Sequence, residues 1–495
     1  MAKLGTPKTH DGYHWTSEGG LQAGLPSVSV VHPPSNIDSG AQEELYDAAI
    51  IGAGYAGLTA ARDLASAGYK VLLLEARDRI GGRTFSANIE GYPFELGGTW
   101  VHWHQPFVWR ELSRYNLTTE LEVSPCTDGT GVNEVVLRIG DEITTLNHEK
   151  ELAILDSVLT KFIDVDGERG RATIPFPFHQ DFLADAARHF DGKSLADRIA
   201  EIADQISPVD RALLEAYLTV LCGGDLENAS FWQLLGCWAL AGYNTLDFVS
   251  AMAVFKLRRG QSDFARRFFD EAAATRNLQY KFECPVTAVS DRGDHVQVTV
   301  KDGATFRAKR VICTTPLNVL RNIGFTPPLP VAKAEALGLQ HVNQVSKVNA
   351  VVQGVELRSF TGMKHPVDGL SFLTGDGVTL AGDTHLVGFG TKFSPKDEIE
   401  GLLEAIRTFS HNKTVERLVF HDWNGDEYSQ GAWAWFRPGM ATKYLEALRE
   451  KHGNVLFASG DWAAGWRGCI DGAIEEGGRV SKEVLDDLKA AGPST

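Results

Sequence analysis

The sequence predicts an α/β protein, and three observations near its start lead to that prediction. Residues 48–51 are apolar, as a buried strand requires. The run Gly52-Ala53-Gly54-Tyr55-Ala56-Gly57 follows directly, and residues 58–67 then have helical character. A second apolar stretch, residues 71–74, ends at Glu75. A strand, a glycine-rich turn, a helix and a second strand in this order begin a doubly wound parallel sheet.

Each glycine of the turn has its own expected task. Gly52 permits the tight turn, Gly54 lets a pyrophosphate approach the backbone, and Gly57 lets the helix pack close to the strand. The helix N-terminus offers unpaired N–H groups and the positive end of its dipole to phosphates. Glu75, at the tip of the second strand, is placed to accept hydrogen bonds from a ribose. We therefore predict a Rossmann-like dinucleotide site rather than an ordinary glycine-rich turn.

The other elements are predicted from local pattern. Residues 1–44 are rich in Pro, Ser and Gly and are expected to form an arm that wraps over the surface or is partly disordered. The remaining elements, in chain order, are a mostly helical region at 149–243, strands at 295–300 and 308–313, a strand-like segment at 339–352, a strand at 454–458, and a final helix from 471 or 472 to 488.

A second signal late in the chain chooses between cofactors. The strand at 454–458 leads into Gly460-Asp461, and Asp461 can bond the ribityl or pyrophosphate region of an extended cofactor. The start of the final helix, around Gly472, Ala473 and Ile474, can place N–H groups near the N1–C2=O edge of a flavin. Reduction leaves negative charge at that edge, which the helix dipole favours. These features favour FAD over NAD.

Composition limits the classes of function. The 495 residues are 43% hydrophobic and 23% charged, as in soluble globular proteins of two or three domains. The net charge of −16 argues against a nucleic-acid partner. No apolar run approaches the ~20 residues of a membrane helix. Six cysteines without CxxC pairs fit free thiols. We expect a soluble intracellular protein, cytoplasmic or peroxisomal, although residues 492–495 are not a Ser-Lys-Leu type address.

His102 and His104 could form a metal pair, because both face one side of an expected strand. No nearby cysteine or group of carboxylates completes such a site. We therefore expect these histidines to pack beside the flavin, and we predict no metal site.

These motifs resemble those of the flavin-dependent amine oxidase family, and within it the monoamine oxidases, above all a fungal member. The likeness extends over nearly the whole chain. It is carried by Gly52 to Gly57, residues 74–83 and 97–100, Lys347, residues 431–433, and residues 460–462 with 471–473.

The resemblance implies an α/β fold of the GR2-type flavoprotein class, with a Rossmann-like FAD-binding domain and an interleaved α+β substrate-binding domain. The expected segments are an arm at 1–44, FAD-binding segments at 45–119, 258–336 and 425–488, substrate-binding segments at 120–257 and 337–424, and a tail at 489–495. The backbone of Val286 should meet the adenine. Further residues expected beside the cofactor are Ala76, Arg77, Gly82, Arg83, Gly98, Thr99 and Trp100. Ala432 stands where some relatives tether the flavin through cysteine, so noncovalent FAD is expected.

The resemblance also implies a reaction. Primary amines, with secondary amines as an alternative, are oxidised to imines that water hydrolyses to aldehydes or ketones, while O2 becomes H2O2. The partners are then a small amine and O2, and a homodimer is the expected assembly. Lys347 is expected to hold a water near flavin N5 and to assist oxygen activation. The plain alternative for Lys347 is a solvated lysine at a strand edge.

The expected substrate pocket departs from the family pattern at one position. Trp433 supplies one of two rings that flank the amine, whereas Cys469 falls where the second ring belongs. The cage is then half open, or Trp466 substitutes for the ring. Phe248, Ala253 and Asn343 are the remaining candidates for the pocket lining.

Three rival functions stay open at this point. An L-amino-acid oxidase needs an arginine to hold the carboxylate, and the sequence assigns none to that place. A polyamine oxidase needs acidic residues along its tunnel, which the net charge alone does not decide. A flavin-free escort resembling Rab GDP-dissociation inhibitors shares the architecture. Glu75, the Gly460-Asp461 pair and Lys347 favour a working flavin enzyme over the escort.

Overall fold

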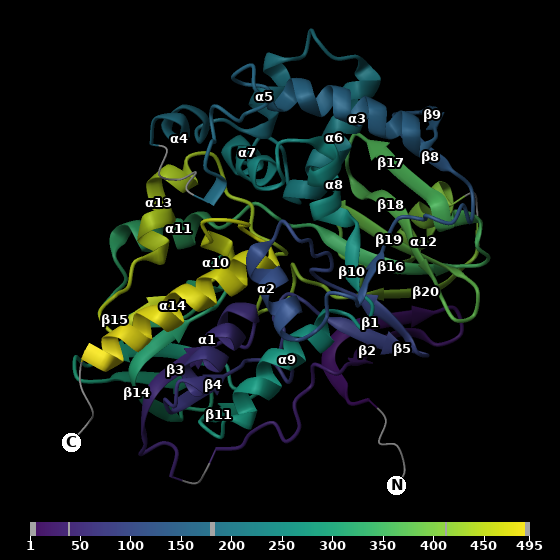
Figure 1. The fold of residues 1–495 in the computed structure, drawn as a ribbon. Coiled ribbons are helices and arrows are strands. Elements are labelled where there is room, and N and C mark those ends of the chain that lie inside the picture. Colours follow the sequence, from purple (N-terminus) through teal and green to yellow (C-terminus); the bar gives the residue numbers. More distant parts are fainter. Residues whose placement is uncertain (1–5, 38–39, 179–183, 411–412, 491–495) are drawn as a thin grey trace.

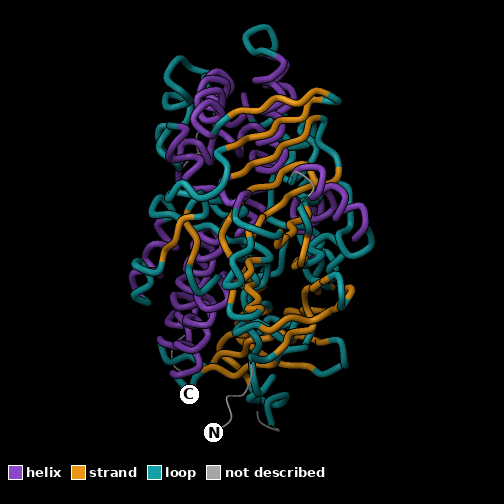
Figure 2. Tube along the Cα trace, turned by 90° about the vertical axis from the view of Figure 1, so that its right-hand side faces the viewer, coloured by secondary structure: helices purple, strands orange, loops and turns teal. Residues whose placement is uncertain are grey.

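The computed structural model describes residues 6–37, 40–178, 184–410 and 413–490, and the chain crosses repeatedly between two parts, each built on a sheet (Figure 1). Strands occupy the centre and right of Figure 2, with helices mainly on the left. No helix in the described ranges combines the length and the apolar character that crossing a bilayer requires.

The first part is an eight-stranded sheet. Its strands, in spatial order, are β11 (Leu278–Lys281), β4 (Val71–Leu74), β3 (Leu45–Ile51), β14 (Thr305–Cys313), β13 (Val296–Val300), β12 (Val286–Asp291) and β15 (Gly324–Thr326), with β21 (Val455–Phe457) also beside β14. β11, β4, β3, β14 and β21 are parallel, so their carboxyl ends meet at one edge. All eight strands lie within the segments 45–119, 258–336 and 425–488, and the five strands predicted there are confirmed.

Helices cover this sheet. They are α1 (Tyr55–Ser66), α2 (Pro106–Arg114), α9 (Gln261–Ala274), α10 (Leu317–Leu320), α11 (Val331–Leu339), α13 (Met440–Arg449) and α14 (Ile470–Ala490), with the short 3-10 turn η3 (Gly460–Trp462). α14 lies against α1 (Figure 1). A Cβ atom at Gly477 would be only 2.4 Å from the Ala56 carbonyl oxygen, so glycine allows this close approach. The first turn of α1 thus packs directly against α14.

The second part is a nine-stranded sheet. Its order is β2 (Gly20–Pro26), β1 (Lys8–Thr16), β20 (Val415–Phe420), β16 (Ser346–Val352), β19 (Thr384–Thr391), β18 (Gly369–Val378), β17 (Phe360–His365), β8 (Glu134–Ile139) and β9 (Glu142–Leu146). β1 and β2 form a hairpin that pairs with β20. Of the two alternatives for the arm, wrapping over the surface or partial disorder, the ordered hairpin excludes disorder for residues 8–26. Backbone pairing with a strand some four hundred positions away leaves no local pattern.

The helices of the second part are α3 (His148–Ile163), α4 (Ala184–Phe190), α5 (Leu195–Glu201), α6 (Pro208–Cys222), α7 (Phe231–Leu240), α8 (Thr245–Ala253) and α12 (Ile399–Phe409), with the 3-10 turn η2 (Glu356–Ser359). They confirm the helical region predicted at 149–243. Two short ribbons, β7 (Leu121–Val123) with β10 (Phe255–Leu257) and β5 (Ser86–Ile89) with β6 (Tyr92–Glu95), complete the fold.

β16 occupies the middle of the nine-stranded sheet. Of the strand-like segment predicted at 339–352, only residues 346–352 form a strand, and every one of them is buried. β16 pairs with β19 on one side and with β20 on the other. Lys347 therefore lies on a central strand, and the alternative of a solvated lysine at a strand edge is wrong.

Candidate active site

A cavity of about 980 Å³ lies at the carboxyl edge of the eight-stranded sheet. Residues that directly follow parallel strands line it: Gly52 after β3, Glu75 after β4, Thr314 after β14, and Ser459 close after β21. Ligands of open α/β sheets bind outside this edge. The predicted cofactor residues that line the cavity are Gly52, Gly54, Ala56, Glu75, Ala76, Arg77, Gly82, Arg83, Gly98, Thr99, Trp100, Val286 and Ala473.

The glycine-rich turn has the geometry that its sequence predicts. Gly52 has φ +103°, and a Cβ atom there would be 2.7 Å from Thr314 Oγ1. A Cβ atom at Gly57 would be 1.9 Å from the Gly52 carbonyl oxygen, so α1 can pack this closely only with glycine. Gly54 is the N-cap of α1 and brings no capping side chain. The first N–H groups of α1 are therefore available to an anion in the cavity.

Glu75 binds the turn as well as lining the cavity. Its carboxylate accepts hydrogen bonds from the N–H groups of Ala53, at 2.5 Å, and Arg77, at 2.9 Å. Burial raises the pKa of this carboxyl group. A carboxylate offers about four acceptor positions, so two remain for a ribose. Ala53 itself is buried and does not line the cavity.

Arg77, one of the predicted cofactor residues, is held by ion pairs. The Arg77 guanidinium donates to Asp426, at 2.6 and 2.7 Å, and to Asp11, at 3.0 Å. Asp11, Asp426 and His421 are residue types that can ligate a metal ion, and their possible ligand atoms lie within 4.8 Å of one another. Because Arg77 and Arg79 already pair with these carboxylates, the group is an ion network that joins the N-terminal hairpin to the nucleotide-binding loop.

Asp461 does not line the cavity. It is fully buried, accepts from the Leu317 N–H at 2.8 Å and forms an ion pair with Arg83. Arg83 lines the cavity and also donates to the Ala432 carbonyl oxygen at 2.7 Å. Asp461 thus fixes Arg83, and the direct contact predicted between Asp461 and the cofactor is absent from the cavity lining.

The start of α14 faces the cavity through Ile470 and Ala473. The other two residues predicted there point elsewhere. Gly472 packs against the Trp466 carbonyl oxygen, which a Cβ atom would approach to 2.4 Å, and Ile474 is buried in the hydrophobic core.

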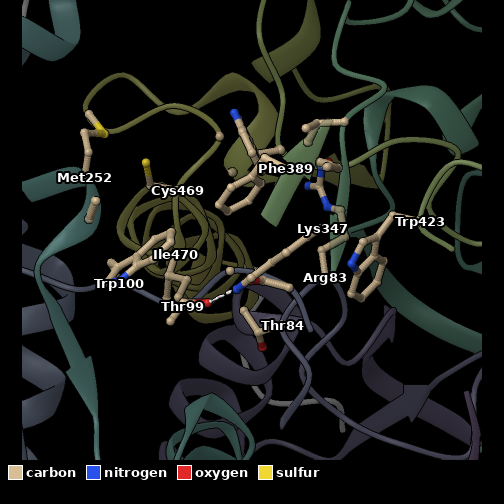
Figure 3. A pocket seen from close by; sticks show the side chains of 18 of the residues that line it. Arg83, Thr84, Thr99, Trp100, Met252, Lys347, Phe389, Trp423, Cys469 and Ile470 are labelled. Carbon is tan, nitrogen blue, oxygen red and sulfur yellow. Dashed lines mark hydrogen bonds between the residues drawn. The ribbon is translucent and has the colours of Figure 1, made fainter. Parts of the chain in front are cut away.

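Lys347 extends from β16 into the cavity lining with only 4% of its surface exposed. Its ammonium group donates to the Gly97 carbonyl oxygen, at 3.0 Å, and to Thr99 Oγ1 (Figure 3). It also lies 5.2 Å from the centre of the Trp100 ring. Burial lowers the pKa of Lys347, while the charge of Glu95 acts to raise it. A lysine of this kind can hold or release a proton near neutral pH.

Glu95 is a member of the site that the sequence analysis missed. One of its oxygens accepts from Ser86 Oγ, at 2.8 Å, and from the Gln261 N–H, at 2.7 Å. The other oxygen is buried without a hydrogen-bond partner in the described part of the chain. Burial raises the pKa of Glu95, and Lys347 lowers it. The only sequence feature that could have indicated Glu95 is its place two positions before Gly97-Gly98.

A second buried lysine, Lys256, lies near enough for its charge to act on Lys347. Lys256 pairs with Asp376 at 2.5 Å, and Asp376 lies 3.4 Å from His385. His385 Nε2 in turn bonds Asn349 Oδ1 at 2.9 Å, two residues along β16 from Lys347. Burial lowers the pKa of His385 to about 3, so its ring is neutral. These contacts link residues from four strands, β10, β18, β19 and β16, that no local sequence pattern brings together.

Aromatic side chains line the part of the cavity beyond Lys347. The Trp433 indole N–H donates to the Leu221 carbonyl oxygen at 2.7 Å, which fixes its ring. Phe389 packs edge-on against it, with ring centres 6.4 Å apart. Cys469 also lines the cavity (Figure 3). Burial raises the pKa of the Cys469 thiol.

Two pocket predictions were wrong. Trp466 is fully buried, its indole N–H donates to the His104 carbonyl oxygen at 2.8 Å, and it does not line the cavity, so it does not replace the missing ring. Asn343 is buried outside the cavity and accepts from the Val345 N–H at 3.0 Å. Phe248 and Ala253 do line the cavity.

His102 does not line the cavity either. It is buried against Trp103, with ring centres 3.8 Å apart, and accepts from the His104 N–H. Burial lowers its pKa to about 4. The described residues add no third metal ligand beside this pair.

Comparison with known proteins agrees with this geometry. Residues 55–485 match the family described as flavin containing amine oxidoreductase. A pseudooxynicotine dehydrogenase of Pseudomonas sp is 29% identical over 460 residues, which cover 92% of this chain and 88% of that protein. The cyclohexylamine oxidase of Brevibacterium oxydans IH-35A shares the fold, with a TM-score of 0.72 at 19% identity over 90% of this chain and 100% of that one. A redesigned putrescine oxidase gives a TM-score of 0.74 at 22% identity over 90% and 99%. This chain belongs to the flavin containing amine oxidoreductase family.

Proposed function

We propose that this chain binds FAD noncovalently in the cavity and uses it to oxidise small amines with O2. Its family accounts for the flavin and the amine chemistry. The observation that carries the finer proposal is Lys347, a buried lysine on a central strand, in the lining of a cavity that begins at a dinucleotide-binding turn. Burying a cation costs free energy unless hydrogen bonds or an opposite charge offset that cost.

The cavity lining supports an extended dinucleotide along its length. The adenosine end would meet Glu75 and Val286, and the pyrophosphate would meet the start of α1 beside Gly82. A Cβ atom at Gly82 would come within 3.2 Å of Gly54 Cα, and Gly82 has φ +60°, so this position favours glycine. The ring end would lie between residues 97–100 and the start of α14.

The side chains near the ring end support noncovalent binding. Ala432 lines the cavity and has no nucleophile. Cys469 also lines it, but burial raises the pKa of its thiol, and a thiol reacts far more slowly than a thiolate.

The residues that line the cavity would hold the flavin, and the flavin would supply two-electron redox chemistry: a hydride equivalent would leave the α C–H bond of the amine, and two electrons would pass on to O2. The overall reaction converts R-CH2-NH2, O2 and H2O into R-CHO, NH3 and H2O2. Trp433 and Phe389 orient the amine and exclude water. The Lys347 cation disfavours a second ammonium group nearby, so the amine binds in its neutral form. The same cation stabilises negative charge that develops on O2.

Polyamines and amino acids remain alternative substrates. Asp376 and Glu151 supply carboxylates in the cavity lining, and Arg358 supplies the arginine that sequence reasoning could not assign. A visible spectrum and a peroxide-coupled screen over alkylamines, benzylamines, polyamines and amino acids test the proposal. A yellow protein that forms peroxide with at least one class is expected. A colourless protein, or a yellow one that forms no peroxide with any class, would contradict it.

A homodimer and a cytoplasmic or peroxisomal location complete the proposal. Light scattering on the purified protein and microscopy of the tagged protein test them.

A further inference from the structure

The cavity has a second polar end, on α3 and α6. Glu151 lines the cavity with 6% of its surface exposed. One of its carboxylate oxygens accepts from the Tyr217 hydroxyl, and the other lies 3.0 Å from His148 Nδ1. His148 Nε2 lies 3.2 Å from the Ser359 carbonyl oxygen. All four residues line the cavity.

The partners favour one protonation pattern in this group. A carbonyl oxygen only accepts, so His148 Nε2 carries a proton, and a carboxylate at Glu151 would accept a second proton's hydrogen bond from Nδ1. The hydrogen bond to Glu151 raises the pKa of His148, as an imidazolium requires. Burial and the Glu151 charge raise the pKa of Tyr217, which keeps its hydroxyl as a donor. Glu151 thus uses two of its roughly four acceptor positions.

A continuous aromatic wall joins this end to Lys347. Lys347 lies 5.9 Å from the centre of the Phe389 ring. Phe389 and Phe372 have ring centres 6.3 Å apart, and Phe372 and Tyr217 have centres 5.9 Å apart. Lys347, Phe389 and Phe372 are partners across three neighbouring strands, spaced ~5 Å apart. Glu151 is therefore on the order of 15 Å from Lys347.

The cavity lining as a whole is mostly apolar. It includes Leu155, Leu214, Leu218, Phe248, Met252 and Phe372. An ionised carboxylate in such a wall costs free energy that its partners must offset. Glu151 retains free acceptor positions in the lining of a cavity long enough for an extended molecule, and a donor on that molecule would use them.

We propose that Glu151, held by Tyr217, binds a hydrogen-bond donor at the far end of the substrate. The inference rests on the proposed function. It specifies the substrate class as an extended amine with an apolar middle and a terminal amino or hydroxyl group. The neutral amino group to be oxidised lies at the Lys347 end, and the distal donor bonds the carboxylate. Simple alkylamines of the same length lack this bond and bind less tightly.

The test compares alkylamines, amino alcohols and α,ω-diamines over a graded series of chain lengths. In the wild type, kcat/KM for the donor-bearing amines should exceed that of the matched alkylamine and pass through a maximum with length. Glu151→Gln should reduce this preference at least tenfold, about 1.4 kcal/mol, and leave alkylamines within about twofold. Glu149→Gln, an exposed neighbour on α3, is the matched control and should change neither.

A binding measurement separates affinity from turnover. Diamines in which both α-carbons are quaternary have no α C–H bond to lose at either end, so calorimetry can measure their Kd on the flavin-loaded enzyme. Their Kd should rise at least tenfold in Glu151→Gln and also rise in Tyr217→Phe, which removes only one hydroxyl group. Tyr217→Phe decides the matter if Glu151→Gln does not fold.

Four outcomes overturn the inference. The first is an equal loss for alkylamines and donor-bearing amines, which would make Glu151 a structural link between helices. The second is a wild type without a length-dependent preference. The third is an unchanged Kd in both variants. The fourth is a preference for ω-amino acids, which would assign the distal group to Arg358. Failure of the proposed function would look different, because then no amine of any kind would yield peroxide.

Discussion

Replacing Gly477 by alanine should loosen the cofactor site from a distance. Its Cβ atom would be 2.4 Å from the Ala56 carbonyl oxygen and 2.8 Å from Thr59 Cβ, whereas ordinary contacts begin near 3.4 Å. α1 and α14 must therefore separate by about 1 Å, and overpacking of this kind costs ~1–3 kcal/mol. The shift displaces the first turn of α1, whose N–H groups are free to meet the pyrophosphate.

Gly478→Ala is the matched control. Both glycines lie on α14, but nothing approaches a Cβ atom at Gly478 within 4 Å. Both variants gain the ~1 kcal/mol by which alanine exceeds glycine in a helix. Only Gly477→Ala pays for the contact, so the variants should differ by ~1–3 kcal/mol, a few degrees in the apparent melting temperature. Thermal scans that follow protein and flavin fluorescence together measure both effects. Equal melting and equal flavin release in the two variants would refute the reasoning.

The remaining predictions concern the cofactor and the reaction. Because Ala432 has no nucleophile, acid precipitation should release all the yellow colour into the supernatant; colour that stays with the protein contradicts noncovalent binding. Glu95→Gln removes the negative charge that raises the pKa of Lys347, so this pKa should fall further. The ammonium is then lost at lower pH, and the pH inflection of flavin reoxidation should move down by about one unit or more; an unmoved inflection disproves the coupling. Cys469→Phe adds the ring absent from the cage, so kcat/KM should rise for small straight-chain amines and fall for bulky ones, shifting their ratio about tenfold. A ratio within about twofold would show that Cys469 does not face the substrate.

The nucleotide-binding half of the fold follows largely from local sequence. The turn from Gly52 to Gly57 requires glycine for reasons of short-range sterics, and the strands beside it are continuous apolar runs. Pattern alone therefore predicts the elements, their order and the edge where the ligand binds. Asp461 shows the limit, because its motif predicts a place near the cofactor, whereas its side chain fixes Arg83 instead.

The substrate half depends on contacts between distant segments. Phe389 is one of several apolar residues in the buried strand β19, and the sequence of this strand gives no reason to choose it over Leu386 or Val387. Only the register with β16 brings it beside Lys347. In the sequence, Glu151 does not differ from other glutamates of a helix. Its role becomes apparent only in the fold, where α6 places Tyr217 against it. Such pairings are properties of the tertiary fold, and the local pattern of a single sequence does not predict them.

Lys347→Met gives the most direct measurement of whether the buried lysine serves the oxygen reaction. The variant should keep its flavin and be reduced by amine without O2. Stopped-flow mixing of the reduced enzyme with O2 should then show reoxidation at least tenfold slower, about 1.4 kcal/mol in the barrier. Lys333→Met is the control for burial, because Lys333 is also buried, but outside the cavity lining, where it donates to the carbonyl oxygens of Leu448 and Glu450. Its reoxidation rate should stay near that of the wild type. An unchanged rate in Lys347→Met would contradict the role assigned to Lys347.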